Sequence, residues 1–341
     1  MALLSLAACR GDSDTDASRP ARRPEKRAPA HDKDDGDDVR CTRDRDRVCV
    51  GDDVVACDGG ELGRRVRTCK DGCKDGRCVA SCASAGSELI YVVDLNADLL
   101  AFDPRKLPND PFRRIGSLKG CDANTEHGAS PFSMSVDRQG MAWVLFGDGA
   151  MYKVSITDAR CQRAMFLPSP GGSPQFGMGY ATDEPGGATE KLYIAGNDDR
   201  HMLSAVDTDA KTPQARDVGR IPVPAGETQN PELTGTGDAR LYGFFPTENE
   251  PSFVQEIDRR SGRALGPKWK LGDRPLGRVT AYAFAHWGGK FYIFVTLGDG
   301  SDRSTVHVLD RTTGKHGVLL ESVPYKISGA GVSTCAPEKD Q

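Results

Sequence analysis

Two kinds of hydrophobic segment alternate along most of the chain, and together they repeat. In one kind Gly, Ala or Ser recurs at every second position, as in 133–136, 177–180, 234–237, 281–285 and 329–333. The other kind is apolar on both faces and centres on an aromatic residue: Tyr91, Trp143, Tyr193, Tyr242 or Tyr292. These centres are 52, 50, 49 and 50 residues apart. A repeat of strands near 50 residues predicts an all-β fold, a five-bladed β-propeller.

The small residues indicate which strand of each blade is innermost. Successive side chains of a strand point to opposite faces, and the strands nearest a propeller's axis crowd together. Small side chains at alternate positions allow that approach. The aromatic segments are apolar on both faces, which suits the next strand of a sheet packed between two neighbouring sheets.

The order of segments predicts how the ring closes. The first blade has strands at 89–94, 99–103 and 112–118, but no small-residue strand precedes them. We expect 329–334 to supply that strand, so that the two ends of the domain share one sheet and leave no open edge. Cys82 and Cys335 flank this closure and are predicted to form a disulfide. Cys121 and Cys161 are predicted to bridge neighbouring blades; the alternative for both pairs is free buried thiols.

Four aspartates recur at the end of the third strand of a repeat: Asp103, Asp207, Asp258 and Asp310. An aspartate in such a place accepts the backbone N–H two residues later, and a following glycine takes up positive φ. The matching turns 258–262 and 310–314 both end in Gly. Because a general acid or base is one placed group and is not copied into each repeat, we interpret these aspartates as turn residues.

The N-terminal region predicts export and a lipid anchor. Eleven cysteines leave one unpaired, and Cys9 ends the sequence Leu-Ala-Ala-Cys, which resembles the lipobox of bacterial lipoproteins. That resemblance implies that the signal peptide is cleaved before Cys9 and that the Cys9 thiol carries a diacylglycerol. Its two acyl chains are enough for stable membrane anchoring. Only eight residues precede Cys9, so we interpret 1–8 as a truncated signal peptide. Residues 9–40 lack aromatic residues and carry charge runs, which predicts a disordered tether.

A compact cysteine-rich module is expected over 41–82. Its cysteines are Cys41, Cys49, Cys57, Cys69, Cys73 and Cys78. So short a segment cannot rest on a hydrophobic core, and it needs covalent crosslinks. It has no histidine and lacks the paired CxxC spacing of a zinc ribbon, so we favour three disulfides over zinc; fifteen pairings remain open. The remaining residues, 83–341, form the predicted propeller domain.

Several segments resemble known proteins. The stretch 49–57, continuing to 69–73, is similar to a six-cysteine module of exported myxobacterial proteins. Segments 131–137, 232–242, 285–289 and 329–337 resemble a family of myxobacterial exported lipoproteins with a propeller-like repeat domain. The resemblance implies export, a lipid anchor and a propeller-like fold, and it implies no activity. Arg10 after Cys9 favours sorting to the outer membrane, by resemblance to enterobacterial lipoproteins.

Candidate chemistry is sparse. The six histidines are scattered, and the sequence contains no HExxH, GxSxG, Walker or GxGxxG motif, so no catalytic residue, metal site or cofactor is predicted. The loop 94–98 begins like a calcium loop but has Leu99 where that loop needs Gly. A net charge of −4 gives no basic field to attract nucleic acid. His286 and Trp287, before a Gly-Gly pair, are weak ligand-binding candidates; the alternative is a packed corner of a blade.

Two functional hypotheses follow. The first is a lipid-anchored binding or scaffold protein of the cell envelope that recognises a glycan, a peptide or an envelope protein. The second is a propeller-type hydrolase or lyase whose acid and base come from separate loops. Exposed aromatic residues at one end of the axis would favour the first, whereas several buried ionisable groups converging on the axis would favour the second.

Overall fold

The computed structural model describes residues 41, 46–69, 72–74, 76–78, 86–121, 129–168, 172–223 and 231–339. The chain divides into two units, 1–39 and 40–341. The predicted signal segment 1–8, the tether 9–40 with its lipidation residue Cys9, and Cys82 lie outside the described residues. Within the described part, one short 3-10 helix, η1 (Pro104–Lys106), accompanies the strands, so the all-β prediction is confirmed. The same part contains no helix with the length and apolar character of a membrane span.

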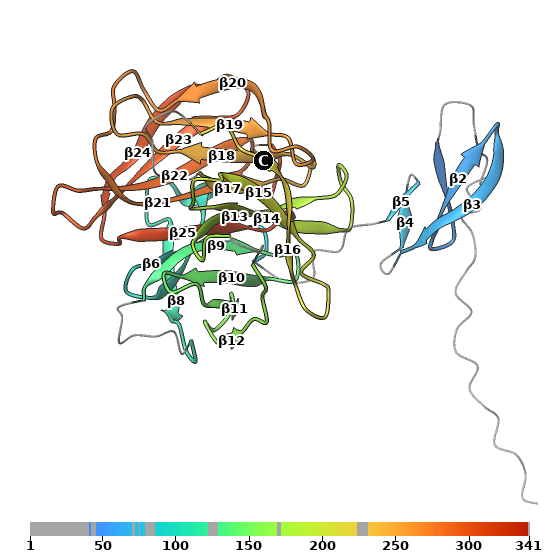
Figure 1. Ribbon diagram of the computed structural model, residues 1–341, viewed down its shortest axis with the longest axis horizontal. Helices are drawn as coiled ribbons and strands as arrows, with labels where there is room; N and C mark the ends of the chain where they lie inside the picture. The colour runs from blue at the N-terminus through green and yellow to red at the C-terminus, as the bar shows by residue number, and fades with distance from the viewer. Residues whose placement is uncertain are drawn as a thin grey trace, which may run out of the picture. The chain divides into compact units, whose positions relative to one another are not determined.

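Five four-stranded antiparallel sheets carry most of the described chain (Figure 1). The first consists of β25 (Ile327–Val332), β6 (Ile90–Asp94), β7 (Asp98–Phe102) and β8 (Phe112–Ser117). The second consists of β9 (Pro131–Val136), β10 (Met141–Phe146), β11 (Met151–Ser155) and β12 (Cys161–Arg163). The third consists of β13 (Phe176–Thr182), β14 (Glu190–Gly196), β15 (Met202–Val206) and β16 (Ala215–Arg220). The fourth consists of β17 (Glu232–Gly235), β18 (Leu241–Phe245), β19 (Phe253–Ile257) and β20 (Ala264–Lys270), and the fifth of β21 (Val279–Trp287), β22 (Lys290–Leu297), β23 (Ser304–Asp310) and β24 (His316–Val323).

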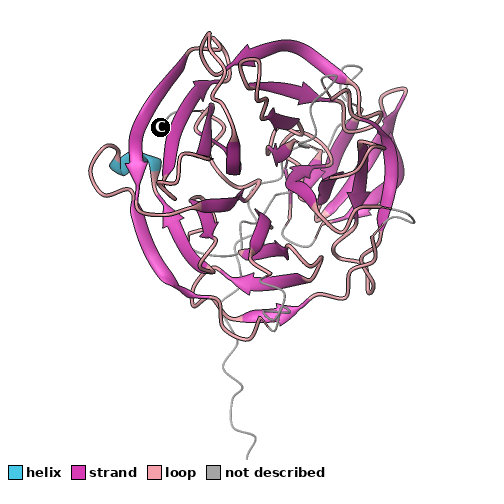
Figure 2. Ribbon diagram, turned by 60° about the vertical axis from the view of Figure 1, so that its left-hand side comes forward, coloured by secondary structure: helices cyan, strands magenta, loops and turns pink. Residues whose placement is uncertain are grey.

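The five sheets form a closed, propeller-like ring (Figure 2). The first strand of each sheet contacts the first strand of the next, in the cycle β9, β13, β17, β21, β25 and back to β9. The closure is the predicted one, because β25 pairs with β6 and sets Gly331 opposite Tyr91. The observed strand starts at Ile327, two residues before the predicted start, and ends at Val332. A strand from the far end of the chain therefore completes the first sheet.

The inner strands approach closely enough to require glycine. A Cβ atom added to Gly331 would lie 2.7 Å from Ser135 Cα on β9, and one added to Gly179 would lie 2.8 Å from Thr234 Cα on β17. Real Cβ atoms do not come that close to backbone, so the alternate small residues are a steric requirement of the ring. The small-residue segment predicted over 234–237 is shorter in the structure, because β17 ends at Gly235. Thr236 begins a turn in which its N–H donates to Arg240 O.

Five hydrophobic clusters fill the five spaces between neighbouring sheets. Alternate residues of one strand serve the two sides: Tyr91 packs toward the sheet of β9, whereas Val92 packs toward the sheet of β22. The middle strands are consequently buried on both faces, as predicted for β6, β10, β14, β18 and β22. Each sheet buries both of its faces only when it lies between two neighbours. Ring closure therefore contributes to the free energy of folding.

The repeated aspartates are turn residues, as predicted. Their carboxylates accept the N–H two residues later at 3.1 Å for Asp103, 3.2 Å for Asp207, and 2.9 Å for both Asp258 and Asp310. Gly262 and Gly314 close two of these turns with φ of 73° and 69°. Asp94 likewise accepts from the backbone of Asn96 and Asp98, and the described residues contain no cluster of three or more metal-ligating side chains.

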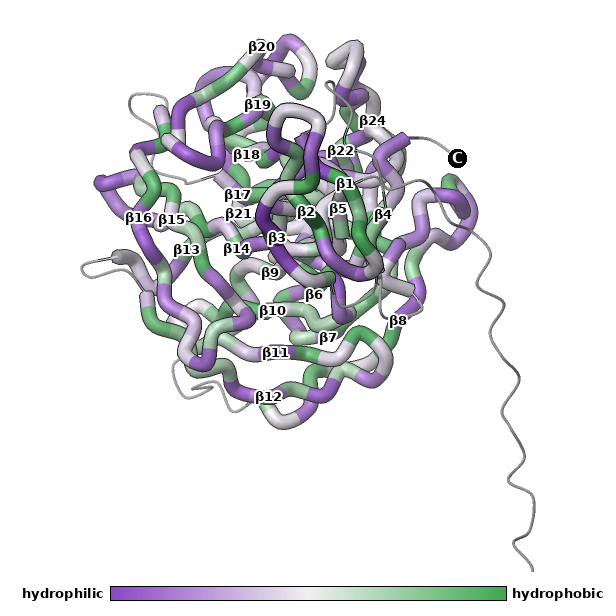
Figure 3. The backbone as a smooth tube through the Cα atoms, turned by 90° about the vertical axis from the view of Figure 1, so that its right-hand side faces the viewer, coloured by the Kyte–Doolittle hydropathy of each residue, from purple (hydrophilic) through white to green (hydrophobic). Residues whose placement is uncertain are grey.

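The cysteine-rich module contains β1 (Arg47–Val50), β2 (Asp53–Asp58), β3 (Glu61–Thr68), β4 (Cys73–Lys74) and β5 (Arg77–Cys78). Its three disulfides are Cys41–Cys57, Cys49–Cys73 and Cys69–Cys78. Strand β3 is almost wholly exposed, and it is predominantly hydrophilic in Figure 3. The module's buried core is a cluster of Val54 with two half-cystines, so crosslinks take the place of apolar packing, as expected for so small a unit.

Two predicted disulfides belong to the sheets. Cys121 and Cys161 are bonded, joining the end of the first sheet to β12 of the second. The parallel bridge between Lys119 and Arg160 lies beside this disulfide. Cys335 is disulfide-bonded as well, while Cys82, its predicted partner, is outside the described residues.

Candidate functional site

The most distinctive hollow lies on the ring's axis, where the inner strands begin. A cavity of about 100 Å³ is lined by residues from four of the five sheets, among them Leu95, Phe132, Glu232, Tyr282 and Ser328. Neighbouring inner strands run in the same direction: Gly329 and Gly331 of β25 lie against successive residues of β9, and Gly177 and Gly179 of β13 lie against successive residues up to Thr234 of β17. Residues far apart in sequence therefore meet at the strand starts.

Glu232 is the one carboxyl group among the described residues lining this cavity. It is the first residue of β17, and its carboxyl group reaches across to residues of the inner strands β9 and β13. The residue is 2% exposed. Its Oε1 accepts from Ser133 Oγ at 2.5 Å and from the backbone N–H of Met178 at 3.4 Å. Both donors are neutral, and they come from two other sheets.

The surroundings of Glu232 disfavour its charge. Burial raises the pKa of this carboxyl well above the ordinary value, and the bonds from Ser133 and Met178 only partly oppose that effect. Burial therefore favours the protonated form of Glu232, and a cation that enters the cavity would favour the carboxylate. It can then act as a donor, as an acceptor, or as a counter-charge for a ligand.

Aromatic and hydroxyl groups complete the cavity. Phe132 and Tyr282 are half-buried, and Thr280 is exposed at the edge. Burial raises the pKa of Tyr282, with the charge of Glu232 adding to the effect, so this phenol stays neutral. Exposed aromatic rings at an axial end are the feature expected of a binding module, and these two half-buried rings match it in part. Sequence reasoning missed this site, because Glu232 precedes the small-residue segment 234–237 and looks like an ordinary polar residue at the start of a strand.

The opposite end of the axis is occupied by the chain's own C-terminal segment. Thr334 Oγ1 donates to Glu190 of β14 at 2.6 Å, and the N–H of Gly237 donates to Glu338 at 2.6 Å. Arg311 pairs with Glu338 at 3.2 Å. Burial raises the pKa of Glu190 to about 7. Ionisable groups do converge here, which is the feature expected of the hydrolase or lyase hypothesis. The bonds described above use these groups to hold the C-terminal segment to three sheets.

The predicted ligand-binding pair lies near that end and is buried. Trp287 is 4% exposed, belongs to the cluster between the fifth and first sheets, and donates its indole N–H to Glu88 O at 2.6 Å. His286 is 2% exposed, its Nε2 has no hydrogen-bond partner, and burial lowers its pKa to about 3. Neither residue lines the axial cavity. A ligand contact by this pair therefore stays a prediction, and the geometry matches the packed-corner alternative.

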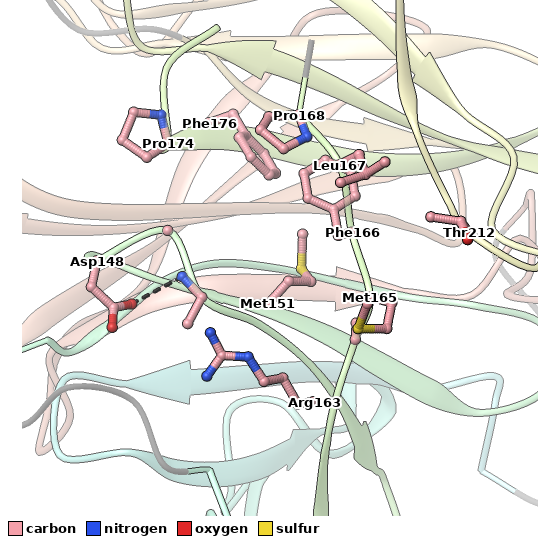
Figure 4. Close-up of a pocket in the computed structure, with 13 residues that line it drawn as sticks. Asp148, Met151, Arg163, Met165, Phe166, Leu167, Pro168, Pro174, Phe176 and Thr212 are labelled. Carbon is pink, nitrogen blue, oxygen red and sulfur yellow. Dashed lines mark hydrogen bonds between the residues drawn. The ribbon is translucent and has the colours of Figure 1, made fainter. Parts of the chain in front are cut away.

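A second, larger hollow of about 290 Å³ lies between the second and third sheets (Figure 4). Its walls are mostly apolar, with Met151, Phe166 and Phe176 on the inside and the exposed Met165 and Leu167 at the edge. Among its described lining residues, Phe176 is the one that belongs to an inner strand, β13, and Asp148 and Arg163 are the one acid and the one base. It offers hydrophobic area without a converging set of polar groups.

Comparison with known proteins identifies no family. No family model and no curated protein matches this chain. Among solved structures, the mitotic checkpoint complex is similar at 10% identity with a TM-score of 0.34, covering 73% of this chain and 79% of that one. The extracellular domain of a hybrid two-component system from B. thetaiotaomicron is similar at 12% identity with a TM-score of 0.35, covering 68% of this chain and 29% of that one. These similarities are too weak to assign a function.

Proposed function

We propose that the five sheets are the blades of a five-bladed β-propeller, and that this propeller is a binding module. The axial cavity carries the proposal, because it gathers Glu232, two half-buried aromatic rings and two hydroxyl groups from four sheets at one end of the ring. Ligand sites are concave, mostly apolar and equipped with a few placed polar groups, and this cavity has that composition. A glycan, a peptide or another envelope protein is the expected class of partner.

Binding is favoured over hydrolysis by the number of acids in the cavity. Glycoside hydrolysis uses two carboxyl groups on either side of the bond that breaks. Among the described residues that line the cavity, Glu232 is the one acid, and Tyr282 is the one other ionisable group. A single buried carboxyl with neutral neighbours suits recognition.

We further propose that the protein is displayed on the cell envelope through lipid on Cys9, at the outer membrane. The lipobox-like sequence before Cys9 supports the anchor. The disulfides of the module and of Cys121 with Cys161 support an oxidising compartment outside the cytoplasm. Cys9→Ser should move the protein from the membrane pellet to the soluble fraction, and retention in the pellet would refute this anchor.

The binding site is tested by filling it. Thr280 is exposed at the edge of the cavity, so Thr280→Trp should block entry without disturbing the core. Gln139 is exposed in the turn between β9 and β10, at the opposite end of the inner strand, and Gln139→Trp is the matched control. Purified protein is screened on glycan and peptide arrays. We expect T280W to lose the ligands that wild type and Q139W retain; equal binding by all three proteins contradicts the proposed site.

A further inference from the structure

We propose that the axial cavity binds an organic ammonium group, such as a lysine side chain or the N-terminus of a peptide, with Glu232 as its counter-charge and Phe132 and Tyr282 as its aromatic walls. The inference rests on the proposed binding function and names the chemical class of ligand that the cavity selects.

Three aliphatic hydroxyl groups, two that line the cavity and one beside it, already use their hydrogens within the protein. Ser328 Oγ donates to Pro131 O at 2.8 Å, and Thr280 Oγ1 donates to Thr296 O at 3.3 Å. Ser133 Oγ donates to Glu232. A hydroxyl has one hydrogen and two lone pairs, so these groups offer acceptors to a ligand. A cavity rich in acceptors fits a ligand that only donates, and an ammonium group is such a ligand.

The charge of Glu232 has no counter-charge in the described structure. Its hydrogen-bond donors, Ser133 and Met178 N–H, are neutral, and no described Lys or Arg lines the cavity. A buried carboxylate without a cation is costly, whereas one paired with a cation is not. An anionic ligand finds no positive charge among the described lining residues. An ammonium ligand supplies the missing positive charge.

The aromatic rings favour a cation as well. Phe132 lies on β9 and Tyr282 on β21, and both line the cavity that contains Glu232. Aromatic faces attract ammonium groups through the ring quadrupole, most strongly where water is displaced. The ring of Tyr282 is itself held in place by Phe244, whose centroid is 6.0 Å away at an angle of 69°. Rings anchored on separate sheets give a preformed site that need not be ordered by its ligand.

The pH dependence follows from the same arrangement. Burial raises the pKa of Glu232 and so favours its acid form in the free cavity, whereas the ammonium complex needs the carboxylate. Binding therefore releases a proton, and affinity rises as pH increases. The groups that face Glu232 are Ser133 on β9, Met178 on β13, Tyr282 on β21 and Ser328 on β25. Of these only Tyr282 titrates, and its raised pKa keeps it neutral over the range of the test.

The test compares three probes of the same chain length: n-butylammonium, 1-butanol and butyrate. Their binding to the full chain is measured by isothermal titration calorimetry between pH 6 and pH 8. We expect n-butylammonium to bind at least tenfold more tightly than the other two, with an affinity that rises by up to tenfold per pH unit. Equal binding of 1-butanol, preference for butyrate, or ammonium binding that weakens with rising pH overturns the proposal. This comparison uses the wild-type protein and needs no variant to fold.

A variant at Glu232 tests whether its carboxylate is the counter-charge of the ammonium group. Glu232→Gln keeps the shape and an acceptor for Ser133, and it should weaken n-butylammonium at least tenfold. Glu321→Gln on the exposed strand β24 is the matched control and should bind as wild type does. Unchanged affinity in E232Q refutes the assignment. If n-butylammonium does not bind while T280W still loses an array ligand, the ammonium inference fails and the proposed binding function stands.

Discussion

Gly331 on β25 tests whether close approach of the inner strands holds the ring together. A Cβ atom at this position would lie 2.7 Å from Ser135 Cα, 2.8 Å from Ser135 C and 2.8 Å from Val136 N. All three atoms belong to the backbone of β9, so no side-chain rotation can relieve the clash. Gly331→Ala must push two inner strands apart, and the closed ring transmits that displacement to the other sheets.

The expected cost combines two opposing effects. Overpacking a core costs about 1–3 kcal/mol. Replacing Gly by Ala also lowers the conformational entropy of the unfolded chain, which stabilises the protein by about 0.4–1 kcal/mol. The net result for G331A is a loss of about 1–2 kcal/mol in the free energy of unfolding. Gly116→Ala on β8 of the same sheet is the control, because its nearest non-neighbouring atom, Ala159 Cβ, lies 3.9 Å from the added Cβ.

Urea unfolding of the oxidised protein measures both variants. Trp143, Trp269 and Trp287 all lie in the sheets and report the transition by fluorescence. G331A should lower the midpoint at an unchanged slope, whereas G116A should leave it unchanged or raise it slightly. Equal stability of G331A and wild type, or equal destabilisation by the two variants, would refute the steric reasoning.

Three further predictions concern particular bonds. Replacing Cys121 and Cys161 by Ser together should cost about 4 kcal/mol in non-reducing urea unfolding, from the 40-residue separation, and a smaller change than 1 kcal/mol would contradict the role of this crosslink. Trp287→Phe removes the indole bond to Glu88 O and should cost on the order of 1 kcal/mol; no loss in thermal unfolding would contradict it. The raised pKa of Glu190, about 7, means that stability is lost as pH rises from 4.5 through 7. Glu190→Gln should therefore stabilise the fold by about 3 kcal/mol more at pH 8.5 than at pH 4, and an effect independent of pH would count against the assignment.

Local patterns in the sequence predicted much of the fold. Alternating small residues identified the inner strands, because the period of two and the size limit are both properties of a few adjacent residues. The aspartate turns were predictable for the same reason: Asp258 and Asp310 bond N–H groups two residues away. The closing strand and the bond between Cys121 and Cys161 followed from counting segments, since a ring allows one place for each.

The candidate site was decided by tertiary structure. Glu232 looks like an ordinary polar residue at the start of a strand, and only ring closure brings it to Ser133, 99 residues earlier. The same closure carries Thr334 to Glu190 across 144 residues. The disulfide pairing of the module was likewise open until the strands were placed. The sequence by itself determined the strands, their turns and their order around the axis, because those depend on neighbouring residues; which side chains meet at the centre depends on all five sheets at once.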